Sequence, residues 1–170
     1  MFLRRALLMV VLGVVMVMFG ASPASAYADY SVSHVPLVST NSVESMGSII
    51  VTFYNLPGCS FSKGSNPDHQ FIVKLPSEYV INTATANVIV PNDASVETDI
   101  KKFGDNQILV EIYAADLVDK VKIALDIKTY IPTNAAEAIT ASIIAQPGSV
   151  FNDGIVQIAR TGFGLVTVEV

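Results

Sequence analysis

The sequence predicts an all-β protein whose strands form a single antiparallel β-sandwich. Three observations support this class. About eight to ten short segments rich in β-branched and aromatic residues follow one another at intervals of about ten residues. Proline, glycine, asparagine and aspartate separate these segments, and none of them carries the apolar spacing of an amphipathic helix. A closed β-barrel fits the same pattern and is the alternative.

The first 26 residues have the pattern of a secretory signal peptide. Arg4 and Arg5 precede an apolar run over residues 6–21, and a small-x-small motif ends at Ala26. The run is shorter than the roughly 20 residues that cross a bilayer. We therefore expect cleavage after Ala26, with an uncleaved anchor as the alternative. Residues 27–170 should form one secreted, extracellular or cell-envelope-associated domain that does not insert into the membrane.

In the first half of the chain, the expected strands are rich in valine, isoleucine and aromatic residues and end at proline, glycine or asparagine. They are residues 30–38, 48–54, 70–75, 79–81 and 86–90. Pro36 lies inside the first of them, so this segment should be an edge strand or contain a bulge.

In the second half, the expected strands are residues 94–100, 107–113, 120–130, 138–145, 155–159 and 165–170. Residues 120–130 alternate most regularly, with Val121 and Leu125 on one face and Lys122 and Asp126 on the other. One buried and one solvated face is typical of an antiparallel sheet. Single helical turns are the alternative for residues 99–103, 114–119 and 134–138. The predicted core residues are Ile49, Val51, Phe53, Phe71, Val73, Leu75, Val88, Val90, Leu109, Ile123, Leu125 and Ile127.

Charge and cysteine content restrict the partners and the source of stability. All fifteen acidic residues but only eight of the ten basic residues follow Ala26, which gives residues 27–170 a formal net charge of −7. An acidic surface repels phosphate backbones, so we expect no nucleic-acid partner. The single cysteine, Cys59, cannot form an internal disulfide, so packing and hydrogen bonds must stabilise the domain. Such a cysteine-poor exported domain fits a bacterial protein.

Several strand phrases resemble a known kind of module. They are "GSIIVTFYNLP", "FIVKLPSEYVI", "ANVIVPNDASV", "QILVEIY" and "KIALDIKTYIP". They are similar to the immunoglobulin-like modules of bacterial cell-surface and S-layer-type proteins. The similarity is greatest to clostridial modules that accompany repeats like the N-terminal domain of copper amine oxidases. The resemblance implies an extracellular immunoglobulin-like β-sandwich and carries over no catalytic residue. The sequence departs from these proteins in having no S-layer-homology repeat and no LPxTG sorting motif, so its means of retention at a surface is open.

The segment between the second and third strands contains Cys59 and is followed by His69. A catalytic Cys-His pair needs a third group that orients the imidazole, and a zinc site needs about four ligands. The only other histidine is His34, and the methionine that a blue-copper site requires after its histidine is missing. The proline, glycine, serine and asparagine of residues 57–68 are typical of a turn-rich loop. We therefore interpret the segment as a loop, and as the best single candidate for a contact surface.

Acidic residues provide three candidate calcium sites: Glu97 with Asp99, Asp116 with Asp119, and Asn152-Asp153-Gly154. The spacing of an EF-hand loop is absent, and turn formation explains these positions more simply. Nucleophile, zinc-protease and phosphate-loop motifs are also absent, and there is no tryptophan for sugar stacking. We expect no catalytic site, no cofactor and no metal.

The function predicted from the sequence is a non-catalytic, secreted structural or assembly protein at the cell surface. Residues 27–39 and 165–170 are strand-like, and a terminal strand can pair with the sheet of a neighbouring molecule. Pairing of both strands within their own domain is the simpler interpretation. A monomeric binding module for cell-wall glycan, a protein partner or a metal ion is the alternative function.

Overall fold

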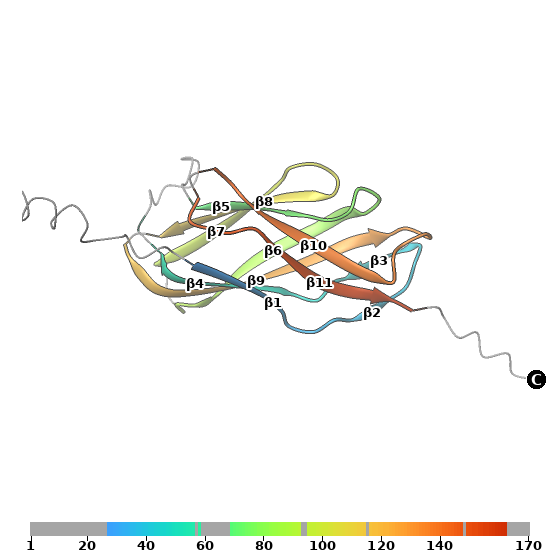
Figure 1. Ribbon diagram of the computed structural model, residues 1–170, viewed down its shortest axis with the longest axis horizontal. Helices are drawn as coiled ribbons and strands as arrows, with labels where there is room; N and C mark the ends of the chain where they lie inside the picture. Colours follow the sequence, from blue (N-terminus) through green and yellow to red (C-terminus); the bar gives the residue numbers. More distant parts are fainter. Residues whose placement is uncertain are drawn as a thin grey trace, which may run out of the picture.

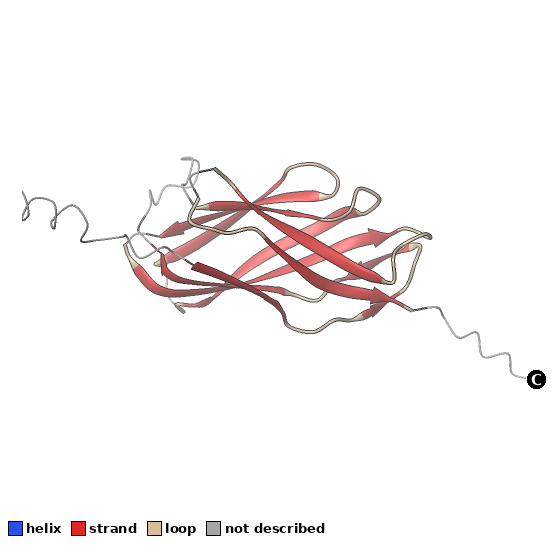
Figure 2. Ribbon diagram, in the orientation of Figure 1, coloured by secondary structure: helices blue, strands red, loops and turns tan. Residues whose placement is uncertain are grey.

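The computed structural model describes residues 27–56, 58, 69–92, 95–114, 116–147 and 149–162. These residues form eleven β-strands joined by loops, and none of them is helical (Figure 2). Accordingly, this part of the chain contains no helix that is long and apolar enough to cross a lipid bilayer. The predicted signal peptide and the predicted strand at residues 165–170 lie outside the described residues.

The strands form two sheets, so the predicted β-sandwich is confirmed (Figure 1). The five-stranded sheet contains β1 (Tyr27–Val32), β3 (Ser42–Ser45), β4 (Ile49–Leu56), β6 (Val80–Val90) and β9 (Val118–Ile131). The six-stranded sheet contains β2 (Leu37–Val38), β5 (Gln70–Lys74), β7 (Val96–Lys102), β8 (Gln107–Ala114), β10 (Ala138–Ala145) and β11 (Gly154–Thr161). All neighbouring strands are antiparallel except β2 and β11, which run parallel.

The N-terminal segment passes from one sheet to the other. β1 pairs with β4 in the five-stranded sheet, whereas β2 pairs with β11 in the six-stranded sheet, beside which it lies in Figure 1. Pro36 lies between β1 and β2, where its missing N–H breaks no ladder hydrogen bond. Its carbonyl oxygen accepts a hydrogen bond of 2.9 Å from the backbone N–H of Arg160. The single strand predicted over residues 30–38 is therefore wrong: it is two strands in different sheets, and Pro36 lies in the connection between them rather than in an edge strand or bulge.

β9 is the centre of the five-stranded sheet, with β6 along one edge and both β4 and β3 along the other. Between β3 and β4, the backbone N–H of Met46 still donates to the carbonyl of Ile127 at 2.9 Å, whereas that of Gly47 donates across to Ile158 of β11 at 2.8 Å. A Cβ atom at Gly47 would lie 1.9 Å from the carbonyl oxygen of His34. Glycine is required here because the backbone at His34, in the connection between β1 and β2, approaches too closely for any side chain.

The core lies between the two sheets, and Phe151 connects them. Its ring centroid lies 4.7 Å from that of Phe53 on β4 and 5.0 Å from that of Phe71 on β5. These separations are typical of packed aromatic pairs. Side chains alternate between core and solvent along β9, where Leu125 is fully buried and Asp126 is exposed.

Nine of the twelve predicted core residues are buried, as the alternation required. They are Ile49, Val51, Phe53, Phe71, Val73, Leu75, Ile123, Leu125 and Ile127. Val88 is partly buried and packs against this core. The predictions for Val90 and Leu109 are wrong. A register shift after Val88 places Val90 opposite Lys122, on the solvent side of the sheet. Leu109 lies between the buried residues Ile108 and Val110, so its side chain faces outward.

Three strand predictions also need correction. The separate strands predicted at residues 79–81 and 86–90 are one strand, β6, and Ala84, which lies between the two predicted segments, packs against the core. The short strand β3 was not predicted, since its sequence SVES has little apolar character. Residues 99–102 belong to β7, so the alternative of a helical turn there is wrong.

Candidate functional site

The loop that contains Cys59 falls almost wholly outside the described residues, so the interpretation of Cys59 stays a prediction. His69, at the end of this loop, is 3% exposed, and its ring lies edge-on to Phe151 with the ring centroids 6.5 Å apart. Its carbonyl oxygen accepts a hydrogen bond of 2.9 Å from the N–H of Ile112. His34 is exposed and lies 3.0 Å from the hydroxyl of Ser33, measured from Nδ1. The two histidines therefore occupy different environments, one against the core and one on the surface.

None of the three candidate calcium sites belongs to a cluster of three histidine, cysteine, aspartate or glutamate side chains in the described part of the chain. Asn152 and Asp153 bind the backbone instead. Oδ1 of Asn152 accepts from the N–H of Ala28 at 3.2 Å, and Oδ1 of Asp153 accepts from that of Ala145 at 2.8 Å. These bonds hold the turn before β11 against β1 and β10, which is the structural role that turn-forming residues often have.

Tyr30 strengthens the same turn. Its hydroxyl donates to the carbonyl oxygen of Asn152 at 2.7 Å. Burial of the phenol raises the pKa of Tyr30 to about 12, and the nearby carboxylate of Asp153 adds to the rise. A Cβ atom at Gly154 would lie 2.6 Å from the Tyr30 ring, so the ring packs directly on the backbone of this glycine. The N-terminal strand is thus tied to its own domain by side chains as well as by its pairing with β4.

The outer face of the six-stranded sheet carries an unusual distribution of side chains. Four apolar side chains, which we call the apolar stripe, run across β11, β10, β5 and β8. They are Ile155, Ile144, Ile72 and Leu109, and strand pairing places Ile144 opposite Ile72 and Ile72 opposite Leu109. Ile155 is 73% exposed and Ile144 is 36% exposed, so one end of the stripe faces solvent. Polar residues border it in the adjacent rows, including Lys74 and Gln70.

A hollow of about 440 Å³ adjoins the exposed end of the apolar stripe. Its lining includes Ser142, Ile144, Asp153 and Ile155. The hollow lies beside the connection between β10 and β11, where the exposed carboxylate of Asp153 accepts a hydrogen bond from the backbone N–H of Ala145. An apolar stripe with a hollow at its end resembles the centre of a protein interface, where one partner inserts an anchoring side chain.

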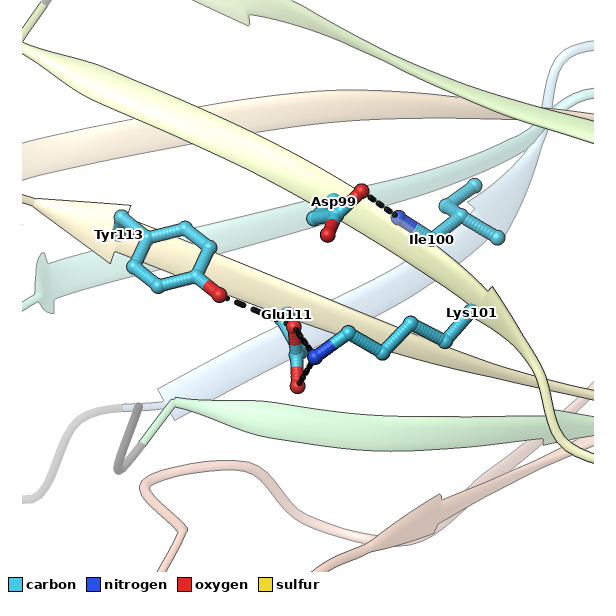
Figure 3. Close-up of polar contacts among 5 residues, drawn as sticks. All are labelled: Asp99, Ile100, Lys101, Glu111 and Tyr113. Carbon is cyan, nitrogen blue, oxygen red and sulfur yellow. Dashed lines mark hydrogen bonds and ion pairs between the residues drawn. The ribbon is translucent and has the colours of Figure 1, made fainter. Parts of the chain in front are cut away.

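A buried ionic cluster lies at the other end of the stripe (Figure 3). Glu111 and Tyr113 alternate with the core residues of β8 and so face outward, yet they are only 2% and 1% exposed. Nζ of Lys101 on β7 lies 2.8 Å from Oε1 and 2.7 Å from Oε2 of Glu111 (Figure 3). The hydroxyl of Tyr113 donates to Oε2 at 2.9 Å. Both oxygens of the buried carboxylate are therefore hydrogen-bonded, as a buried charge requires.

Asp99 explains why a lysine is needed in this cluster. Strand pairing places Asp99 directly opposite Glu111, and two like charges in that position destabilise a sheet. Lys101, two residues along β7, reaches diagonally to Glu111 and supplies the compensating charge. Its hydrogen bond with Glu111 raises the pKa of Lys101, so the amine stays charged throughout the neutral range. Asp99 itself accepts from the adjacent N–H of Ile100 at 3.0 Å (Figure 3).

The stripe and the cluster were not predicted from the sequence, although part of the signal was present. Residues 107–113 alternate, and the even-numbered residues Ile108, Val110 and Ile112 form the more apolar set. Assigning them to the core places Leu109, Glu111 and Tyr113 together on the outer face. The proximity of Lys101 and Ile144 to that set depends on the order of the strands, which the sequence does not reveal.

No protein-family model matches this chain, and no curated protein matches its sequence. Among solved structures, the fold overlaps with a cohesin module from a family 33 glycoside hydrolase of Clostridium perfringens ATCC13124. The sequences are 11% identical, the TM-score is 0.46, and the match covers 82% of this chain and 100% of the cohesin module. The resemblance to clostridial S-layer-associated modules thus stays a prediction, and the comparisons assign the chain to no family.

Proposed function

We propose that this protein is a secreted, non-catalytic assembly module, and that it binds other protein molecules through the outer face of its six-stranded sheet. The apolar stripe is the observation that carries this proposal. Exposed apolar side chains that form a continuous group with a polar border are typical of protein-binding surfaces. Single exposed apolar residues need no such explanation, but here Ile144 and Ile155 are exposed on the adjacent strands β10 and β11, and the stripe continues from them to Ile72, which is only 9% exposed.

The first partner to consider is a second copy of the chain. A two-fold contact requires a surface that is complementary to itself. The outer face carries charges of both signs beside the apolar stripe. Lys74 and Lys101 are positive, and Glu97 and Asp99 are negative. Two copies can therefore bury the exposed ends of their stripes, Ile144 and Ile155, against each other while opposite charges meet at the border.

Exchange of the N-terminal strand is a less favoured route to assembly. β1 pairs with β4 over six residue pairs, and the Tyr30 and Asn152 contacts hold it further. Leaving its own sheet would break these hydrogen bonds before any contact with a neighbour formed. A face-to-face contact between complete domains breaks none of these hydrogen bonds.

Light scattering on a size-exclusion column tests the proposal. The protein is purified from the medium of cells that express the full chain, and its mass is measured over a concentration series. We expect the mass to rise with concentration and the Ile144→Glu variant to remain a monomer, because a charge in the stripe opposes its burial. Thr52→Glu, on the outer face of the other sheet, is the matched control and should assemble normally. A monomer at every concentration would refute contact between copies, and an Ile144→Glu protein that still assembles would exclude the stripe.

A further inference from the structure

The outer face of the five-stranded sheet contains a second hollow, of about 570 Å³. Six polar residues contribute to its lining, namely Ser45, Ser48, Thr83, Thr85, Asp126 and Lys128. It lies over β9 where the chain leaves the sheet between β3 and β4. Met46 turns into the core at this break and is only 5% exposed. Met46 and Ile127 also line the hollow, and β6 borders it on the other side of Asp126 and Lys128.

The polar lining restricts the class of ligand. Four hydroxyls, one carboxylate and one ammonium share the lining with Met46 and Ile127, so a ligand without polar groups would leave the hydroxyls and the charges without hydrogen bonds. A single carboxylate beside an ammonium is a poor site for a divalent cation, which prefers several oxygen ligands. The carboxylate also repels a phosphate or other anion, as does the net charge of the protein. An uncharged ligand rich in hydroxyl groups remains.

Asp126 is already held in one orientation. Its Oδ1 accepts a hydrogen bond from the hydroxyl of Ser48, and its Oδ2 accepts one from Nδ2 of Asn87 at 3.3 Å. Each carboxylate oxygen can accept a further bond, so the group can bind two neighbouring hydroxyls of one ligand. Holding the carboxylate in place beforehand reduces the entropy lost on binding. Lys128 provides donors beside these acceptors.

An apolar row borders the hollow at the next position along β9. Tyr130 faces the same side as Lys128, and strand pairing places Val43 and Val80 on either side of it. Val43 is 51% exposed and Val80 is 38% exposed. The hydroxyl of Tyr130 donates to Oδ1 of Asn41 at 2.7 Å, which fixes the ring. An apolar row beside hydroxyl-binding groups suits a molecule with apolar ring faces and polar edges.

We propose that this face is a binding site for an uncharged oligosaccharide, with Asp126, Thr85 and Lys128 bonding its hydroxyls and Tyr130 packing against a sugar ring. This inference is independent of the proposed protein contact, because the two faces belong to different sheets. A chain with both sites can bind a glycan on one side and a protein on the other.

Isothermal titration calorimetry with three neutral probes tests the inference. The probes are cellotetraose, maltotetraose and tetra-N-acetylchitotetraose, each up to about 5 mM, which detects dissociation constants in the millimolar range. We expect at least one probe to bind the protein purified from the medium. The Asp126→Asn and Thr85→Val variants should each weaken binding at least about tenfold, because each leaves a ligand hydroxyl without its partner. Thr140→Val, on the six-stranded sheet, is the matched control and should bind as the unmodified protein does.

Four results would overturn the inference. They are no heat of binding with any probe, unchanged affinity in both variants, equal weakening by the Thr140→Val control, and displacement of the bound sugar by inorganic phosphate. Thermal unfolding of each variant, followed by circular dichroism, distinguishes a lost contact from a lost fold. If Asp126→Asn lowers the melting temperature, Thr85→Val decides the result, since its side chain keeps its shape. Light scattering on the same samples separates failure of this site from failure of the protein contact.

Discussion

Replacement of Leu125 by aspartate tests the central feature of the fold, the division of β9 into a core face and a solvent face. Leu125 is fully buried, and strand pairing places it between Ile49 on β4 and Ala86 on β6. We expect Leu125→Asp to abolish folding. The adjacent residue Ala124 is half-buried on the opposite face of the sheet, so Ala124→Asp is a control that introduces the same group one position away.

Three costs add up to the loss of folding free energy expected for Leu125→Asp. Removing the leucine side chain from a fully buried position costs about 2–5 kcal/mol. An aspartate in its place loses its hydrogen bonds with water, which costs about 1–3 kcal/mol even when the group is neutral. The buried carboxyl must also stay protonated at pH 7, which is about three units above the ordinary pKa of aspartate. Protonating it at this pH costs about 4 kcal/mol. The total of about 7–12 kcal/mol is comparable with the whole free energy of unfolding of a typical domain, about 5–15 kcal/mol.

Circular dichroism and urea unfolding measure the outcome. Leu125→Asp should show no cooperative transition at pH 7. Any residual structure should become more stable as the pH falls, because the folded state then binds the proton that the buried carboxyl requires. Ala124→Asp should unfold cooperatively, with a loss of less than about 1 kcal/mol, as is usual for surface substitutions. A soluble Leu125→Asp protein with a normal, pH-independent transition would refute the assignment of residue 125 to the core.

Three other substitutions test local interactions. The unmodified protein should lose stability as the pH rises from 10 to about 12, because the unfolded Tyr30 ionises near pH 10 while the folded one keeps its proton to about pH 12. Tyr30→Phe should not show this part of the loss. Urea unfolding over that pH range would show whether the two proteins differ. Lys101→Met should destabilise the protein at neutral pH, and the difference from the unmodified protein should disappear as the pH rises through the raised pKa of Lys101; equal stability at pH 7 would mean that Glu111 does not depend on this lysine. Cys59→Ser should change neither the melting temperature nor the metal content, and a loss of bound metal from the purified protein would overturn the interpretation of Cys59 as a loop residue.

The sequence by itself determined the fold class and the facing of the most regular strand, β9. Residues 120–130 alternate so clearly between apolar and polar side chains that the period of a strand predicts which of them are buried. Val121 and Leu125, which this pattern assigns to the core, are buried in the structure. These features depend on backbone geometry and side-chain type within a few residues, which a sequence displays directly.

Prediction from the sequence failed where a segment depends on a distant partner. The polar strand β3 exists because the long strand β9 extends beyond the end of β4 and offers it backbone hydrogen bonds. β6 continues through its small residues because the core accepts Ala84 and Ala86 there. The outward position of Val90 results from a register shift, and a shift by one residue exchanges the faces of a strand.

The candidate surfaces were decided by the tertiary structure alone. Ile144, Ile72 and Leu109 come from three strands far apart in the sequence, and only the order of those strands aligns them into a stripe. Asp126 was visible as a solvent-facing residue of β9, but the hollow above it depends on the break between β3 and β4. Local alternation determines which side of a sheet a residue occupies, whereas strand order and register determine its neighbours, and a binding surface consists of neighbours.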